Sequence, residues 1–148
     1  MSELSNKTVS TLIDKALDML QYSYTPYSGF KVGAALLAKN GTIYGGCNIE
    51  NAAYTPCSCA ERTAFFKAVS EGVKEFDAIA VVGGPDGKVT EYTAPCGVCR
   101  QVMMEWCDPA SFQVFIAIDR DHYKEYLLEE ILPDGFGPGN LKMKKTGG

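Results

Sequence analysis

The sequence has 148 residues, of which 46% are hydrophobic, and a formal net charge of −4 with a pI near 5.0. This length suits a single domain with one substantial core. The acidic balance argues against long nucleic acid as a partner, because phosphate binding needs clustered Lys and Arg. No apolar run is long enough to span a bilayer, and residues 1–7 carry no targeting signal. With six cysteines, these features predict a cytoplasmic protein whose thiols are reduced.

Apolar periodicity and turn residues predict the elements of the first half of the chain. Hydrophobic residues recur at helical spacing over residues 8–22, which predicts an amphipathic helix. Residues 31–38 and 43–47 are short apolar runs, and the Asn40-Gly41 pair between them is typical of a β-hairpin turn. Loops are expected before and after this hairpin, at residues 23–29 and 48–57.

The second half alternates helices and buried strands. Ser58 is expected to be an N-cap with Glu61 completing a capping box, so that a helix packed on both sides runs to about residue 71. The continuous apolar run at 78–82 is typical of a central strand. The remaining expected elements are a helix at 97–106, a buried strand at 112–118 and a last helix at 123–132 stopped by Pro133.

This element order predicts an α/β fold: a single-domain, three-layer α-β-α sandwich with a mixed central sheet, formed by residues 1–148. Ligands of such sheets bind beyond the strand ends, where loops and helix N-termini converge. Residues 137–148 are rich in Gly and Pro and then in Lys, and are expected to form a flexible, solvated tail.

Three cysteines and one carboxylate stand at two predicted strand-to-helix junctions. Cys59-Ala60-Glu61-Arg62 has a Glu two residues after the Cys, and Pro95-Cys96-Gly97-Val98-Cys99 contains a Cys-x-x-Cys pair. A catalytic zinc site uses three protein ligands and leaves the fourth position for water, whereas a structural site uses four. This order of residues matches the zinc deaminase pattern, in which the Glu is not a ligand. It predicts one Zn²⁺ per subunit on Cys59, Cys96 and Cys99, with Glu61 moving protons.

Other interpretations of these residues are open at this point. A Cys-x-x-Cys pair alone could be a redox couple or half of a structural zinc site. Cys57 is a rival of Cys59, but it lacks a Glu two residues on, and we expect it to be a small hydrophobe like Cys47 and Cys107. Arg62 could offset the negative charge of three thiolates by donating to sulfur. Arg100 could be a surface residue or support the site, and His122 is expected to have no catalytic role.

Five stretches together resemble the small, homotetrameric, three-cysteine cytidine deaminases over nearly the whole length of the chain. These stretches are YSGFKVGAA at 27–35, CNIENAAY at 47–54, CAERTA at 59–64, PCGVCRQ at 95–101 and LPDGF at 132–136. The resemblance implies zinc-dependent hydrolytic deamination of cytidine and deoxycytidine to uridine and deoxyuridine plus ammonia, a reaction of pyrimidine salvage. It also implies a homotetramer.

The same resemblance implies roles for individual residues. Asn48 and Glu50 bind the ribose hydroxyl, and Phe30 stacks on the pyrimidine. The backbone at Ala60 and the turn before Cys96 contact the edge of the base. Two further substrate-binding residues, which we expect to reach the site of a neighbouring subunit, are Tyr54 and Phe136.

Physical reasoning supports some of these residue roles and leaves two alternative functions open. Asn48 and Glu50 face the same side of an extended segment, and the Glu50 carboxylate would repel a nucleotide phosphate. Phe30, taken alone, would more often be a core residue. A different deaminase substrate (a nucleotide, a free base or a nucleoside-like antibiotic) is one rival. The second is a catalytically silent zinc module, against which Glu61 argues because a structural site needs no such carboxylate. Aromatic loop residues support self-association: Tyr22, Tyr24, Tyr27 and Tyr54.

Overall fold

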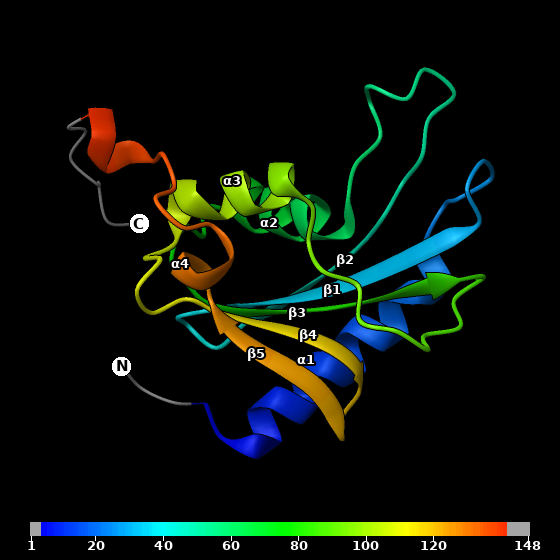
Figure 1. Ribbon diagram of the computed structural model, residues 1–148, viewed down its shortest axis with the longest axis horizontal. Helices are drawn as coiled ribbons and strands as arrows, with labels where there is room; N and C mark the ends of the chain where they lie inside the picture. The colour runs from blue at the N-terminus through cyan, green and yellow to red at the C-terminus, as the bar shows by residue number, and fades with distance from the viewer. Residues whose placement is uncertain (1–3, 142–148) are drawn as a thin grey trace.

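The computed structural model describes residues 4–141, which form a five-stranded mixed sheet with helices on both faces (Figure 1). The strand order is β2-β1-β3-β4-β5, with β3 and β4 parallel and every other pair antiparallel. The strands are β1 (Phe30–Ala38), β2 (Ile43–Cys47), β3 (Phe76–Pro85), β4 (Gln113–Asp119) and β5 (His122–Leu127). The predicted α/β class with a mixed central sheet is therefore confirmed.

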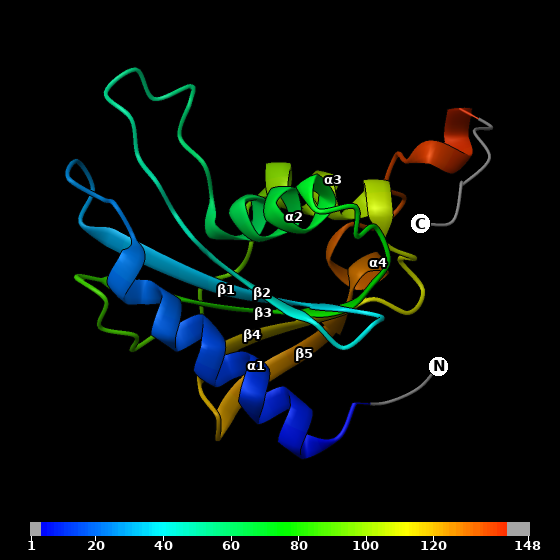
Figure 2. The ribbon, with the colours of Figure 1, turned by 180° about the vertical axis from the view of Figure 1, so that it is seen from behind.

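The helices make the two outer layers of the sandwich. One face of the sheet carries α1 (Asn6–Met19), and the opposite face carries α2 (Ala60–Ser70) and α3 (Gly97–Trp106), as Figures 1 and 2 show from two sides. The short α4 (Leu128–Ile131) lies at the end of β5. Within residues 4–141 no helix has the length and apolar character needed to cross a membrane.

Two hydrophobic clusters, one on each face, explain why the sheet strands are buried. Along β1, Ala34 and Leu36 pack in the cluster under α2 and α3, whereas Ala35 and Leu37 pack in the cluster under α1. This alternation follows from the period of two in a strand. Phe65 of α2 is fully buried at the centre of the first cluster. Both faces are apolar because both are covered, as expected for the inner strands of a three-layer domain.

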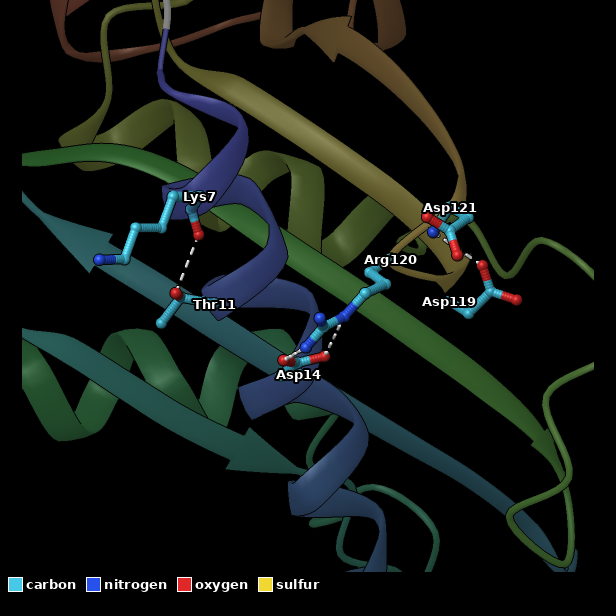
Figure 3. Close-up of polar contacts among 6 residues, drawn as sticks. All are labelled: Lys7, Thr11, Asp14, Asp119, Arg120 and Asp121. Atoms are coloured by element: carbon cyan, nitrogen blue, oxygen red, sulfur yellow. Dashed lines mark hydrogen bonds and ion pairs between the residues drawn. The ribbon is translucent and has the colours of Figure 1, made fainter.

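The Asn40-Gly41 turn forms the predicted hairpin between β1 and β2. Gly41 has a φ of +91°, and the Asn40 side chain accepts the Thr42 N–H at 2.9 Å. At the other end of the sheet, the β4–β5 turn reaches α1 through an ion pair between Arg120 and Asp14 (Figure 3).

The main correction concerns residues 123–132, which were expected to form a single helix. Residues His122–Leu127 instead form β5, paired with β4 from Asp119↔His122 to Gln113↔Leu127, and only Leu128–Ile131 are helical. Pairing with β4 gives these residues backbone partners that a local pattern does not reveal, and it overrides helix propensity.

Two smaller expectations about α2 are also corrected. The N-cap is Cys59, not Ser58, and no side chain caps the helix. The backbone of Ser58 pairs with Ile49 in an isolated bridge, and its hydroxyl contacts Thr63 Oγ1 at 3.2 Å. The helix is not buried all round, since Phe66 is 48% exposed. Of the expected tail, residues 137–141 are described, and Pro138–Leu141 form a short 3-10 helix. Residues 142–148 lie outside the described residues.

Candidate active site and metal centre

Three thiols converge where α2 and α3 begin. Cys59 Sγ is 3.7 Å from Cys96 Sγ, which is 3.5 Å from Cys99 Sγ, and all three sulfurs lie within 4.8 Å of one another. Tetrahedral zinc with Zn–S bonds of about 2.3 Å holds its sulfurs about 3.8 Å apart. The three predicted ligands are thus brought together with the spacing that one zinc ion requires, and the residues fit that metal.

The helix N-termini place these sulfurs in a positive field. Cys59 is the N-cap of α2 and Cys96 the N-cap of α3, both with extended backbone, and neither helix has a side-chain cap. Cys99 follows in the first turn of α3 and is buried. Free N–H groups and the helix dipole stabilise negative charge, which favours thiolates at these positions.

Arg62 lies directly against the thiol group. Its Nη2 donates to Cys59 Sγ at 3.4 Å and to the Cys57 carbonyl oxygen at 3.4 Å. Hydrogen bonds from Cys99 and then from Arg62 lower the pKa of the Cys59 thiol, whereas the bond to Cys59 and burial raise the pKa of the Cys99 thiol. The guanidinium of Arg62 therefore favours a thiolate at Cys59.

Glu61 is the carboxylate of this site. It sits in the first turn of α2, and only 3% of its surface is exposed. Burial is the main cause that raises its pKa, to about 7. A buried carboxyl beside three thiols that could hold a metal ion is an arrangement suited to proton transfer.

Asn48 makes hydrogen bonds that the sequence did not reveal. Its Oδ1 accepts the Val32 N–H at 2.9 Å, and its Nδ2 donates to the Phe30 carbonyl oxygen at 2.8 Å. The amide thereby holds the start of β1, where the Phe30 ring is 38% exposed. One N–H and one lone pair of the amide are left for a ligand.

Glu50 also makes contacts within the chain. Its carboxylate accepts the N–H groups of Tyr27 at 3.0 Å and Ser28 at 3.1 Å, together with the Ser28 hydroxyl. These bonds, that of the Ser28 hydroxyl first, lower the pKa of Glu50. The loop before β1 and the segment after β2 therefore form one connected surface that includes Phe30, Asn48 and Glu50.

Tyr54 and Phe136 are not brought together within one chain. The loop after β2 and the segment after α4 project at opposite ends of the α2–α3 layer (Figures 1 and 2). The Tyr54 side chain is 72% exposed with its ring edge-on to Tyr27, and the Phe136 carbonyl accepts Gln101 Nε2 at 2.7 Å.

The structure also shows the contacts of Cys57, His122 and Arg100. Cys57 is outside the thiol group, and its Sγ accepts the Asn51 N–H at 3.2 Å. His122 pairs with Asp119 at the β4–β5 turn. Arg100 supports the site from α3, because its Nε donates to the Pro95 carbonyl at 2.9 Å and its Nη1 to the Ile131 carbonyl at 2.6 Å. These bonds fix the turn before Cys96, and the sequence alone left this role undecided.

Comparison with known proteins agrees with the fold and with the thiol group. Residues 6–114 match the family described as the cytidine and deoxycytidylate deaminase zinc-binding region. A cytidine deaminase of Sporosarcina psychrophila is 48% identical over 133 residues, which are 90% of this chain and 94% of the relative.

Solved structures give the same result. A cytidine deaminase structure from Burkholderia pseudomallei has a TM-score of 0.77 at 44% identity and covers 85% of this chain and 97% of its own. One from Mycobacterium tuberculosis has a TM-score of 0.73 at 35% identity, covering 86% and 95%. The mixed five-stranded sheet and the three-cysteine group are thus those of a zinc-binding deaminase domain. This chain belongs to the cytidine deaminase family.

Proposed function

We propose that the chain catalyses the zinc-dependent hydrolysis of cytidine and deoxycytidine to uridine and deoxyuridine plus ammonia, as an enzyme of pyrimidine salvage in the cytoplasm. The observation that carries this proposal is the buried Glu61 in the first turn of α2, two residues after Cys59, which is one of three convergent thiols. A silent structural site gains nothing from a buried carboxylate beside its ligands, and burying a charged group costs stability.

Cys59, Cys96 and Cys99 would hold one zinc ion per subunit. When bound, zinc supplies a water of lowered pKa at its fourth position as the nucleophile. Glu61 accepts a proton from the attacking water and delivers it to N3 of the pyrimidine, which makes C4 electrophilic. After water has added to C4, Glu61 carries the proton of the new C4 hydroxyl to the exocyclic amino group. The bond between C4 and this amino nitrogen then breaks, ammonia leaves, and the C4=O bond of uridine forms.

The other residues would hold the nucleoside in place. Phe30 would stack on the ring, the backbone at Ala60 would contact the base edge, and Asn48 and Glu50 would bind the ribose. The carboxylate of Glu50 favours an uncharged sugar over a phosphate, because the two negative charges would repel each other. We expect cytidine and deoxycytidine to be turned over and dCMP to be a poor substrate.

Self-association is part of the proposal. Large side chains at the chain surface support it, since a monomer rarely leaves so many exposed. They are Tyr22, Tyr24, Tyr27, Tyr54, Phe66 and Phe136. Tyr54 and Phe136 would then complete a neighbour's site in a homotetramer. Light scattering that gives a monomer mass would remove this part of the proposal.

The first experiment is uridine formation from cytidine, followed by ultraviolet absorbance with and without a zinc chelator. Glu61→Gln, which keeps the shape of the side chain, should retain zinc and lose at least about 100-fold in kcat. Cys96→Ala should lose zinc itself. Absence of turnover by folded, zinc-loaded wild-type protein would refute the proposed substrate, and near-normal turnover by Glu61→Gln would refute the role of Glu61.

A further inference from the structure

The hydroxyl of Thr63 lies where α2 meets the end of β2. Its Oγ1 is 3.0 Å from the Cys47 carbonyl oxygen, 3.2 Å from the Cys59 carbonyl oxygen and 3.2 Å from Ser58 Oγ. A hydroxyl has one proton to donate. The Cys59 carbonyl already accepts the Thr63 backbone N–H at 3.1 Å. The hydroxyl of Thr63 therefore donates its proton to the Cys47 carbonyl oxygen. Thr63 thereby links the helix to the strand.

The helix and the strand touch directly at the same place. A Cβ on Gly46 would stand 2.3 Å from the Ala60 carbonyl oxygen and 2.7 Å from the Ala64 nitrogen, so no side chain fits between β2 and α2. This contact fixes how closely the two backbones approach, but van der Waals contact has little directionality. The hydrogen bond of Thr63 is directional and therefore also fixes where the helix lies along the strand.

The two linked elements carry the two halves of the proposed site. The helix bears Cys59 at its N-cap and Glu61 in its first turn, while Asn48 and Glu50 follow directly after the end of the strand at Cys47. We infer that Thr63 is a positioning residue whose hydroxyl aligns the metal-binding half with the sugar-binding half. This inference rests on the proposed function, because that function assigns the base to one half and the sugar to the other.

Thr63→Val tests this inference because valine keeps the branched shape and removes the hydroxyl. We expect kcat/KM for cytidine to fall about 10-fold, with zinc content and melting temperature close to wild type. Thr63→Ser keeps the hydroxyl and should restore most of the rate, whereas Thr63→Ala should not. The matched control is Ser70→Ala at the other end of α2, which removes a hydroxyl that bonds only the Lys67 carbonyl in the contacts described and should leave kcat/KM unchanged.

A double-mutant cycle with Glu50→Gln separates alignment from general stability. If Thr63 aligns the sugar-binding half, adding Thr63→Val to the Glu50→Gln variant should lower kcat/KM for cytidine by less than about 2-fold. The same 10-fold loss in both backgrounds, or wild-type kinetics of both Thr63→Val and Thr63→Ala, would overturn the inference while leaving the proposed function intact. Absence of cytidine turnover by the wild-type chain would overturn both.

Discussion

Two adjacent glycines of β2 face opposite layers of the sandwich, and replacing each by alanine should give different results. At Gly46 the new Cβ would meet backbone atoms of α2, with the Ala60 carbonyl oxygen 2.3 Å away. At Gly45 it would meet only the flexible ends of side chains on α1, with Met19 Sδ at 2.6 Å and Lys15 Cε at 2.9 Å. Side-chain ends can rotate away, whereas a helix backbone has to move as a whole.

The size of the effect follows from the required movement. An ordinary contact begins at 3.4 Å, so the α2 backbone at Ala60 would have to retreat by about 1 Å. Overpacking of this kind costs about 1–3 kcal/mol in the free energy of unfolding. Because Ala60 lies between Cys59 and Glu61, the same movement displaces a proposed zinc ligand and the proposed proton carrier. An error of about 1 Å there can cost about 100-fold in rate.

Urea unfolding, zinc content and cytidine kinetics measure these effects together. Gly46→Ala should lose about 100-fold in kcat/KM, whereas Gly45→Ala should stay within about 3-fold of wild type and lose less than about 1 kcal/mol in stability. Equal kinetics of Gly46→Ala and wild type would refute the argument that this contact places the site. An equal loss in both variants would assign the effect to the strand rather than to the helix.

Four further predictions follow from single side chains. Phe65→Ala should lower the free energy of unfolding by about 3–5 kcal/mol in urea melts, because the ring is fully buried against Phe76 and Phe112. A loss below about 1 kcal/mol would contradict this prediction. Arg62→Gln removes the guanidinium that contacts Cys59, and it should speed zinc loss to a chelator or lower kcat. If neither the rate of zinc loss nor kcat changes, Arg62 has no effect on the site. Hydrogen bonds hold the pKa of Glu50 below its ordinary 4.5, so the contribution of the carboxylate is present above this value and is lost only as the pH falls below it. The ratio of the cytidine KM of Glu50→Gln to that of wild type should thus be constant from neutral pH to about 5, because titration of Glu61 affects both proteins; a ratio that falls well above pH 5 would contradict this. Arg120→Ala breaks an ion pair with Asp14 (Figure 3) and should leave the urea midpoint unchanged at physiological salt, because the pair is exposed. A clear shift of the midpoint would mean that this contact holds α1 on the sheet.

Much of the fold is determined by local sequence. The apolar spacing of the first helix, the Asn40-Gly41 turn and the apolar runs of the inner strands each act over a few residues, and each was predicted close to its observed position. The family motifs likewise identify Cys59, Glu61 and the Cys96–Cys99 pair without knowledge of the fold. Local patterns were misleading at β5, because its exposed, charged strand depends on β4 for hydrogen-bond partners.

The tertiary structure alone decided which distant groups meet. Packing of α2 and α3 on one face of the sheet brings Cys59 within 3.7 Å of Cys96, 37 residues away in the chain. Pairing of β2 with β1 gives Asn48 its partners Val32 and Phe30, and packing of α2 on β2 gives the Thr63 hydroxyl the carbonyl of Cys47. These bonds could not be read from the sequence, because a side-chain donor can pair with any carbonyl within reach and only the packed backbone determines which carbonyl that is.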